Sequence, residues 1–400
     1  MGCIIFDEAG TADSAREGEI LAGSDAIAGA GGRRSGLSSE AGRVTFRSGF
    51  FRTPWGRQSI RNFKEETSMR AYWYDRAGPA ADVLQFGELP DPEPGPGEVR
   101  VRIAYSAINP TDVKRRATGR ELARFSPIIP NNDGSGVIDK VGEGVNNARI
   151  GQKVWIFGAQ HGRPQGTAAE YVVLPTRQAI SLAGDVSLSQ GACAGVPVVT
   201  AYHALFCDGD ISRKTVLVTG GTGRVGAYAV QLGVWGGARV ITTCGSEEHC
   251  AEARDLGAAV ALNYKEPDLK ERILEAAGGP VDRIVEVAFG SNTDLLPDIL
   301  KPNGTVATYA SDAVPEPVIP FNKWMGGNVN IRMFTIYQLD RLTQDDVLQT
   351  VSPLMSPDTL VHRIGERFQF DDMVKAHEAV EAGDVHGVAQ VVVAKNLEHQ

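Results

Sequence analysis

The pattern of apolar and polar positions divides this chain into three parts. Residues 1–68 keep no sustained apolar period of 2 or 3.6 residues. From Met69 onward short alternating segments appear, and from about Leu188 helical stretches alternate with brief apolar runs. Alternation indicates half-buried strands and the longer period indicates amphipathic helices, so the pattern predicts a β-rich part followed by an α/β part.

The first 68 residues are expected to be a disordered or non-native N-terminal extension, with Met69 the first residue of the functional protein. They are rich in Gly, Ala, Ser and Arg and offer too few apolar side chains to offset the entropy of ordering them. Phe6 stands where a myristoylation signal requires Ser or Thr. Asp7 and Glu8 interrupt the apolar start that a secretory signal needs, and the nine acidic residues here are unlike a transit peptide. A cytoplasmic location is therefore expected.

The β-rich part consists of predicted strands separated by turns that are dense in glycine and proline. Val99, Val101, Ile103 and Tyr105 alternate along one such strand and predict a half-buried face. Strands are predicted at Met69–Tyr74, Glu98–Ala107, Asn131–Gly144, Lys153–Gly158 and Gly166–Leu174. Short strands at this spacing are typical of an all-β, barrel-like domain.

The α/β part alternates short apolar strands with helices. The predicted strands are Thr215–Thr219, Arg239–Thr242, Ala259–Asn263, Arg283–Ala288 and Thr305–Tyr309. The predicted helices are Tyr228–Val234, Glu247–Leu256, Asp268–Ala277 and Thr293–Leu300, and a later pair consists of a helix at Phe368–Ala382 and a strand at Val388–Ala394. Strand–helix alternation predicts βαβ units and a parallel sheet.

A glycine-rich loop carries the strongest chemical signal. In VLVTGGTGRVG, Gly220, Gly223 and Gly226 follow an apolar strand and open a helix. Glycines allow a tight turn and a close approach of a phosphate to the backbone, and the helix N-terminus offers free N–H groups to a pyrophosphate. In this strand–turn–helix context the loop predicts a dinucleotide-binding site rather than a plain turn.

The end of the following strand bears on which dinucleotide binds. NAD sites place an acid about 20 residues after the glycine loop to hold the ribose 2′-OH. The segment Thr242–Ser246 carries no acid, which leaves room for a 2′-phosphate and favours NADPH. Ser246, His249 and Arg224 are candidate donors to that phosphate, although sequence alone leaves the charge of His249 open.

Composition removes several other classes of protein. The net charge of −9 disfavours a protein that binds nucleic acid by neutralising phosphates. None of the five cysteines have C-x-x-C spacing and none of the seven histidines lie three to five residues apart, so no metal site is expected. No run of 18 apolar residues predicts a membrane span, and no membrane partner is expected.

Several short motifs follow one another in a specific order. They are Asn109-Pro110-Thr111-Asp112, Asp133-Gly134-Ser135-Gly136-Val137, Val141-Gly142, Ala169-Glu170-Tyr171, Pro197 through Thr200-Ala201-Tyr202, the glycine loop, Leu256-Gly257-Ala258 and Asn263-Tyr264. In order and spacing, from Met69 to about Lys395, the chain resembles the zinc-independent medium-chain dehydrogenases/reductases. Within them it is most similar to the NADPH:quinone reductase (zeta-crystallin-like) group.

The resemblance implies an α/β plus β fold, in which a GroES-like β-barrel domain carries an inserted Rossmann domain with a doubly wound parallel sheet. The expected boundaries are 69–194 and 332–400 for the GroES-like catalytic domain and 195–331 for the Rossmann domain. The implied activity is hydride transfer from NADPH to a small-molecule quinone or enone. An enoyl-thioester (2-enoyl-CoA) reductase and a non-catalytic NADPH-binding protein remain alternatives. A homodimer through the Rossmann edge near 329–335 is also implied.

The resemblance assigns the site residue by residue. Asn109, Asp112 and Thr200 match positions around the nicotinamide and form the expected catalytic set. The expected cofactor site comprises Gly220, Thr222, Gly223, Arg224, Val225, Gly226, Ser246, His249, Tyr264 and Phe334. Simpler explanations remain open: Asp112 as a helix cap, Asn109 as a turn former before proline, and Tyr264 as a strand-end aromatic.

Two departures from the wider family bear on the expected metal content and on the expected substrate. Zinc-dependent relatives hold a catalytic metal with Cys and His, and the matching positions here are Asn109 and Asn132, whose amides are poor zinc ligands. Lys114 stands where many members of the group have Tyr. Because related enoyl reductases look to that Tyr as a proton donor, the enoyl-thioester alternative is disfavoured.

Overall fold

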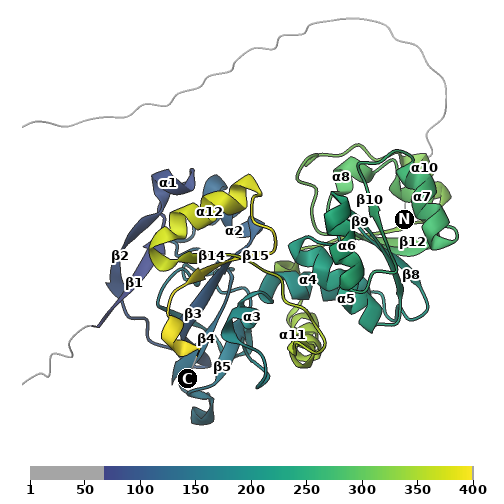
Figure 1. Ribbon diagram of the computed structural model, residues 1–400. Coiled ribbons are helices and arrows are strands. Elements are labelled where there is room, and N and C mark those ends of the chain that lie inside the picture. The colour runs from purple at the N-terminus through teal and green to yellow at the C-terminus, as the bar shows by residue number, and fades with distance from the viewer. Residues whose placement is uncertain (1–66, 399–400) are drawn as a thin grey trace, which may run out of the picture. The chain divides into compact units, whose positions relative to one another are not determined.

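A computed structural model describes residues 67–398 of the chain (Figure 1). The expectations for residues 1–66 therefore lie outside the described residues, and Ser68 already belongs to the first strand. The described part has one mainly antiparallel sheet and one parallel sheet, together with a two-stranded ribbon. None of its helices combines the length and the apolar character needed to cross a bilayer.

The β lobe is built on a seven-stranded sheet in the order β14-β15-β3-β4-β5-β7, with β6 paired to β3. Its pairings are antiparallel except for β14 with β15. Its strands are β3 Glu98–Ile108, β4 Asp133–Val141, β5 Lys153–Ile156, β6 Tyr171–Pro175, β7 Ala179–Ser181, β14 Ile364–Gln369 and β15 Val388–Val392, beside the ribbon of β1 Ser68–Trp73 and β2 Gln85–Pro90. Its helices are α1 Ala80–Val83, α2 Pro110–Thr118, α3 Leu188–Ala192 and α12 Met373–Ala382.

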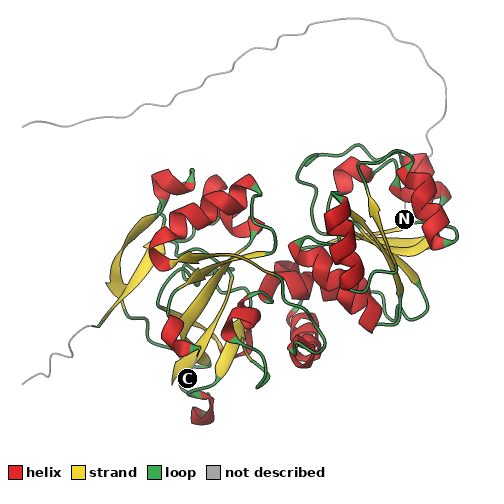
Figure 2. Ribbon diagram, viewed as in Figure 1, coloured by secondary structure: helices red, strands yellow, loops and turns green. Residues whose placement is uncertain are grey.

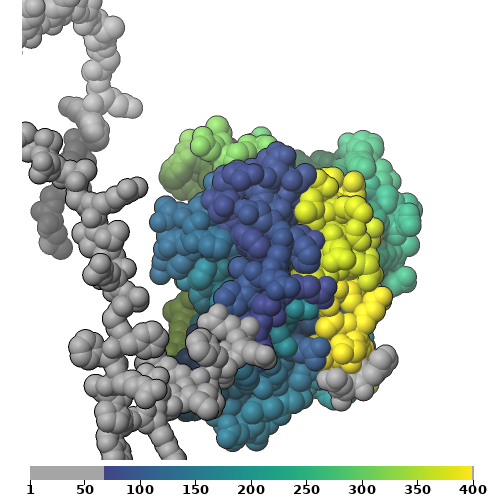
Figure 3. Space-filling model, turned by 90° about the vertical axis from the view of Figure 1, so that its left-hand side faces the viewer, coloured from purple at the N-terminus to yellow at the C-terminus, as the bar shows by residue number. Residues whose placement is uncertain are grey.

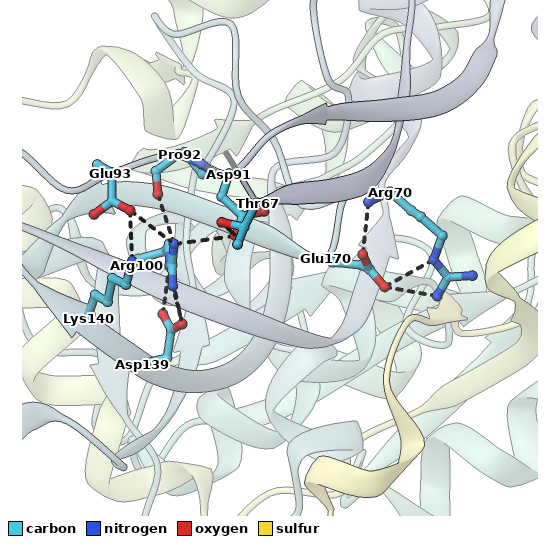
Figure 4. A network of polar contacts seen from close by, with 9 residues as sticks. All are labelled: Thr67, Arg70, Asp91, Pro92, Glu93, Arg100, Asp139, Lys140 and Glu170. Carbon is cyan, nitrogen blue, oxygen red and sulfur yellow. Dashed lines mark hydrogen bonds and ion pairs between the residues drawn. The ribbon is translucent and has the colours of Figure 1, made fainter. Parts of the chain in front are cut away.

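Strand β3 is buried along almost its whole length, although its alternation predicted one exposed face. The strand pairs with β4, β6 and β15, so both of its edges are covered. Arg100, which the pattern places on the polar face, is buried and forms a two-pronged ion pair with Asp139 at 2.6 Å (Figure 4). The carbonyl of Pro92 and the carboxylate of Glu93 lie on the same guanidinium. Pairing with carboxylates is what allows an arginine to stay charged inside the sheet.

The nucleotide lobe contains a six-stranded parallel sheet in the order β10-β9-β8-β11-β12-β13. Figure 2 shows the strands of this lobe in yellow among its red helices. Its strands are β8 Thr215–Val218, β9 Arg239–Cys244, β10 Val260–Asn263, β11 Val281–Glu286, β12 Leu300–Thr308 and β13 Asn330–Met333. Its helices are α4 Gly195–Phe206, α5 Arg224–Trp235, α6 Glu247–Asp255, α7 Leu269–Ala277, α8 Phe289–Asn292, α9 Leu296–Ile299, α10 Phe321–Gly326 and α11 Arg341–Val351.

Both faces of the parallel sheet are covered by helices. Val216 and Val218 of β8 pack in the cluster that contains residues of α4, α5 and α11, whereas Leu217 packs in the cluster that contains residues of α7, α9 and α10. A strand buried on two faces needs apolar residues at every position. This explains why these strands read as continuous apolar runs rather than as alternating ones.

The C-terminal segment returns to the β lobe, but it does so differently from the prediction. Residues 368–382 were expected to be one helix, whereas Phe368 and Gln369 end β14 and pair with Val391 and Val392 of β15. The helix proper, α12, begins at Met373. At the start of the predicted helix, pairing with β15 outweighs the local helical pattern. Figure 3 shows the first strands beside this returning segment on one face of the molecule.

Two further expectations about the nucleotide lobe were wrong in detail. The helix predicted at 293–300 is instead the short α9, and Leu300 already begins β12. The expected domain boundary at 331 falls inside β13, which pairs with β12. Val347, Leu348 and Val351 of α11 also belong to the core of α4 and α5. The nucleotide lobe therefore continues beyond residue 331.

Candidate cofactor and active site

A cavity of about 740 Å³ lies at the carboxyl edge of the parallel sheet. Each of the six strands contributes at least one lining residue at or just beyond its last residue: Gly220 after β8, Ser246 after β9, Tyr264 after β10, Val287 after β11, Tyr309 after β12 and Phe334 after β13. Helix α2 of the β lobe contributes Pro110, Thr111 and Lys114. Open parallel sheets bind ligands at this edge, where the strand order reverses.

The strand order gives the cavity two halves. The glycine loop (Gly220–Gly226) follows the central strand β8, with β9 and β10 on one side and β11, β12 and β13 on the other. Ser246 and Tyr264 therefore line one half, and Tyr309 and Phe334 line the other. An elongated ligand such as a dinucleotide can span both halves with its pyrophosphate at the glycine loop.

Glycine is required within the loop by close backbone approaches. Gly220 has φ +68°, a left-handed conformation that residues with a Cβ rarely adopt. A Cβ on Gly226 would stand 2.1 Å from the carbonyl oxygen of Gly220. Helix α5 begins at Arg224, directly after Gly223. Its first N–H groups have no partner within the helix and are free to bind phosphate.

Arg224 adds a positive charge to the glycine loop. Its Nε and Nη2 atoms are buried and make no hydrogen bond to the described part of the protein. Burial lowers the pKa of its guanidinium, but arginine remains charged at neutral pH. Two buried guanidinium nitrogens without hydrogen-bond partners are costly unless an anion pairs with them. The side chain therefore fits the phosphate groups of a dinucleotide.

The half of the cavity beside β9 and β10 is rich in polar groups. The Ser246 hydroxyl accepts a hydrogen bond from the His249 backbone N–H at 3.2 Å and so caps α6. The imidazole of His249 stacks on that of His386, with ring centroids 4.3 Å apart. His386 comes from the loop before β15, and Lys265 also lines this half. Sequence reasoning missed Lys265 and His386.

Arg363 joins this half to the C-terminal segment. Its guanidinium donates to the carbonyl of Thr222 in the glycine loop and pairs with Glu252 of α6. His249, Glu252 and His386 are the one group of three His, Cys, Asp or Glu residues within residues 67–398 whose ligand atoms lie close enough to share a metal ion. The guanidinium of Arg363 bonds to both Glu252 and His386. This side chain therefore supplies the positive charge that a metal ion would bring to the cluster.

On the β-lobe side, Asn109 lines the cavity and Asp112 does not. The Asp112 carboxylate accepts from the Asn109 backbone N–H at 2.8 Å, which caps α2, and from Asn132 Nδ2 at 2.5 Å. The contacts of Asp112 are therefore those of a helix cap, which is the simpler of the two explanations given for this residue. Through the bond to Asn109, Asp112 contacts a residue that lines the cavity without lining the cavity itself.

The two positions expected to match the zinc ligands of zinc-dependent family members, Asn109 and Asn132, belong to an amide–carboxylate network. Asn109 donates from Nδ2 to Asp133 Oδ2 at 2.7 Å, and Asp133 Oδ2 also accepts from the Val196 N–H. Burial, followed by the neighbouring Asp112, raises the pKa of Asp133 to about 8, and burial also raises the pKa of Asp112. Both amides use their nitrogen as donors, and neither carboxylate belongs to a described three-residue ligand group. This donor set contains neither the thiolate nor the imidazole groups that typically hold zinc.

All of the other predicted site residues line the same cavity. These are Asn109, Thr200, Gly220, Thr222, Gly223, Arg224, Val225, Gly226, Ser246, His249, Tyr264 and Phe334. The Thr200 hydroxyl bonds to the Val196 carbonyl within its own helix at 2.7 Å. Tyr309, Asp312 and Tyr337 were not predicted as site residues. Tyr309 ends a predicted strand on the cavity edge, so the strand pattern held a signal for it.

The fold and the cavity together define a two-domain oxidoreductase that binds a nicotinamide dinucleotide. The family "Alcohol dehydrogenase GroES-like domain" matches residues 95–184, and "Zinc-binding dehydrogenase" matches residues 225–355. The "Quinone-oxidoreductase homolog, chloroplastic" of Spinacia oleracea is 31% identical over 258 residues, which cover 62% of this chain and 76% of the relative. The chain belongs to the medium-chain dehydrogenase/reductase family, in its quinone reductase-like group.

Solved structures agree with this fold. A quinone oxidoreductase from Coxiella burnetii has a TM-score of 0.69 and 28% identity, covering 82% of this chain and 100% of that chain. An NAD-dependent alcohol dehydrogenase has a TM-score of 0.74 and 26% identity, with the same coverage of both chains. The two neighbours differ in the activity that their titles give, so the substrate of this chain has to be argued from its own residues.

Proposed function

We propose that this protein is an NADPH-dependent reductase that transfers hydride to a quinone or another conjugated carbonyl without zinc. The observation that carries the proposal is the cavity that joins the glycine loop and the unpartnered Arg224 to Asn109 of the β lobe. Relatives named quinone oxidoreductases support the choice of acceptor.

The preference for NADPH is supported by the half of the cavity beside β9 and β10. Within residues 67–398 no Asp or Glu lines this half, and Lys265, Ser246 and Tyr264 do. An acid at this place would hold a ribose hydroxyl and repel a 2′-phosphate. Lysine and hydroxyl groups instead offer hydrogen bonds and positive charge to that phosphate.

The bound cofactor supplies a hydride at its nicotinamide ring, and the residues of this chain supply position and environment. The loop N–H groups and Arg224 bind the phosphates. Phe334, which packs against His203, and Thr200 border the opposite half, where the nicotinamide would lie beside the acceptor. Asn109 is held by Asp112 and Asp133, so its place at the wall of the cavity is fixed before a ligand binds.

The activity is tested by following the oxidation of NADPH and of NADH at 340 nm with a panel of quinones, enones and enoyl-CoA thioesters. We expect turnover with quinones or enones and a higher kcat/KM with NADPH. Turnover only with enoyl-CoA would move the protein to the enoyl-thioester reductases. Cofactor binding without turnover of any acceptor would make it a non-catalytic NADPH-binding protein.

Independence from zinc is tested by metal analysis of the purified protein and by treatment with a chelator. We expect less than stoichiometric zinc and the same turnover after chelation. A stoichiometric zinc ion whose removal abolishes turnover would contradict this part of the proposal.

The proposal also includes a cytoplasmic homodimer formed through the edge strand β13. Met333 at the end of this strand is 60% exposed, and among the described strands β13 has a partner on one side only. An unpaired strand edge is a ready surface for a second copy of the chain. Sedimentation of wild type and Met333→Lys tests the interface, and a wild-type monomer at micromolar concentration would contradict it.

A further inference from the structure

An ion pair bridges two walls of the cavity at the half where the acceptor would bind. Lys114 Nζ of α2 lies 2.6 Å from Asp312 Oδ1, and both residues line the cavity. Lys114 stands on the same side of α2 as Pro110 and Thr111, which also line the cavity. Asp312 follows β12, on the side of the glycine loop opposite β9 and β10. The pair therefore belongs to the acceptor half and not to the half with Lys265.

The charges that line the cavity are few and divided between its two halves. Arg224 and Lys265 are the cations at the glycine loop and beside β10, and Lys114 is the cation of the opposite half. Asp312 is the only acid among the described residues that line the cavity. Lys114 thus has one partner within the cavity wall, and that partner is the acid that a substrate oxygen would replace.

The pair is able to open. The side chains of Lys114 and Asp312 are 53% and 66% exposed. Exposed ion pairs of this kind contribute at most about 1 kcal/mol, because water screens the charges and two long side chains must be ordered. Exchanging the carboxylate of Asp312 for another oxygen anion therefore costs little.

We propose that Lys114 donates a hydrogen bond to the acceptor oxygen that becomes negative during reduction, and that Asp312 holds the ammonium group until the acceptor enters. This inference rests on the proposed function. In an enone, hydride adds to the β-carbon, the electron pair of the C=C bond shifts, and the carbonyl oxygen becomes an enolate. In a quinone the product is the hydroquinone monoanion. Water then supplies the one proton that completes either product.

The physical reason is that negative charge develops on one oxygen of the acceptor as it is reduced. A donor positioned at a developing oxyanion stabilises the transition state more than the neutral ground state. Lysine is suited to this role because its ammonium is a compact charge on a flexible stem. A donor of this kind lowers the activation barrier and therefore acts on kcat.

The kinetic test compares Lys114→Met, Lys114→Arg and Asp312→Asn with wild type, using the acceptor that wild type turns over best. We expect Lys114→Met to lower kcat by about 10-fold or more, since single oxyanion donors contribute on the order of 100-fold in enclosed sites. Lys114→Arg should restore part of this loss, and Asp312→Asn, which removes the competing partner of Lys114, should increase kcat/KM. Lys140→Met is the matched control, because Lys140 pairs with Glu93 at 2.7 Å and does not line the cavity.

A binding test separates this role from turnover. 4-Nitrophenol becomes a coloured phenolate and serves as a probe of an oxyanion bound in the acceptor half. With NADP⁺ present, the apparent pKa of the bound probe should be lower in wild type and Asp312→Asn than in Lys114→Met. An identical probe pKa in wild type and Lys114→Met would overturn the inference.

The failures of the two proposals are distinguishable. If wild type turns over none of the acceptors, the proposed function fails. If wild type is active and Lys114→Met has the same kcat, or changes only KM, the oxyanion role fails while the reductase activity stands. NADPH titration by fluorescence must give the same Kd for wild type and Lys114→Met, because a changed Kd would show that Lys114 acts on the cofactor instead.

Discussion

The side chains of Asn109 and Asp133 are joined by a buried hydrogen bond, in which Asn109 Nδ2 donates to Asp133 Oδ2 at 2.7 Å. Asp133 is buried beside a second carboxylate, Asp112, and both pKa values are raised. The bond therefore connects a cavity-lining amide to an acid that holds its proton at neutral pH. It has consequences for the pH dependence of stability.

We expect Asp133 to make the protein less stable as the pH rises from about 4 to 8. Its pKa is about 8 when folded against an ordinary value of 3.8, so in this range the folded state binds a proton that the unfolded state has lost. The free energy of unfolding then falls with pH, by at most about 1.4 kcal/mol per pH unit from this group. Asp133→Asn, which resembles the protonated acid, should remove this contribution.

Urea denaturation of wild type and Asp133→Asn at pH 5 and pH 8 measures the effect. Relative to wild type, the free energy of unfolding of Asp133→Asn should be higher at pH 8 than at pH 5. If the two proteins differ in unfolding free energy by the same amount at both pH values, Asp133 has no raised pKa in the folded protein.

We expect Arg224→Gln to weaken the binding of NADPH and NADH alike. The unpartnered guanidinium of Arg224 lies in the loop where the pyrophosphate would bind, and both cofactors carry that group. Hydrogen bonds to charged groups contribute about 1.5–3 kcal/mol, which corresponds to roughly 10–100-fold in Kd. Fluorescence titration with each cofactor checks this, and an unchanged Kd for both would assign Arg224 to a purely structural role.

Lys265→Met is expected to discriminate between the two cofactors. Lys265 lines the half of the cavity beside β10, where we propose that the 2′-phosphate carried only by NADPH would bind. The Kd for NADPH should rise by about 10-fold while the Kd for NADH stays constant, since one charge-assisted contact is lost. Loss of affinity for both cofactors would place Lys265 elsewhere along the dinucleotide.

Gly226→Ala should damage the glycine loop. The new Cβ would stand 2.1 Å from the Gly220 carbonyl oxygen, and a backbone atom cannot move aside cheaply. We expect a loss of 1–3 kcal/mol in stability, as is typical of overpacked sites, together with weaker cofactor binding. Gly184→Ala is the control, because its Cβ would meet no atom within 4 Å. Thermal unfolding of the two variants compares them, and equal melting temperatures would contradict the steric argument.

The local sequence was sufficient to predict the elements that are marked by apolar runs or by regular glycine spacing. The apolar runs predicted β8 to β11, and the glycine spacing after β8 predicted the loop that lines the cavity. These features depend on neighbouring residues only: a strand covered on both faces needs apolar side chains, and a tight turn toward a phosphate needs glycine. The β-rich and α/β parts and the glycine loop therefore followed from the local pattern, whereas the two-domain fold followed from the resemblance to the medium-chain reductases.

The tertiary structure decided whatever depends on pairing between distant segments. Phe368 and Gln369 become strand because β15 is available to pair with them, against the helical pattern that follows. Asp112 faces Asn132 rather than the cavity, and Lys114 meets Asp312 across it, although neither partner is near in sequence. Periodicity states which face of an element is apolar, but it does not state which charged group stands opposite. That choice is made by the packing of the whole chain, which fixes the network beneath the site and the ion pair across it.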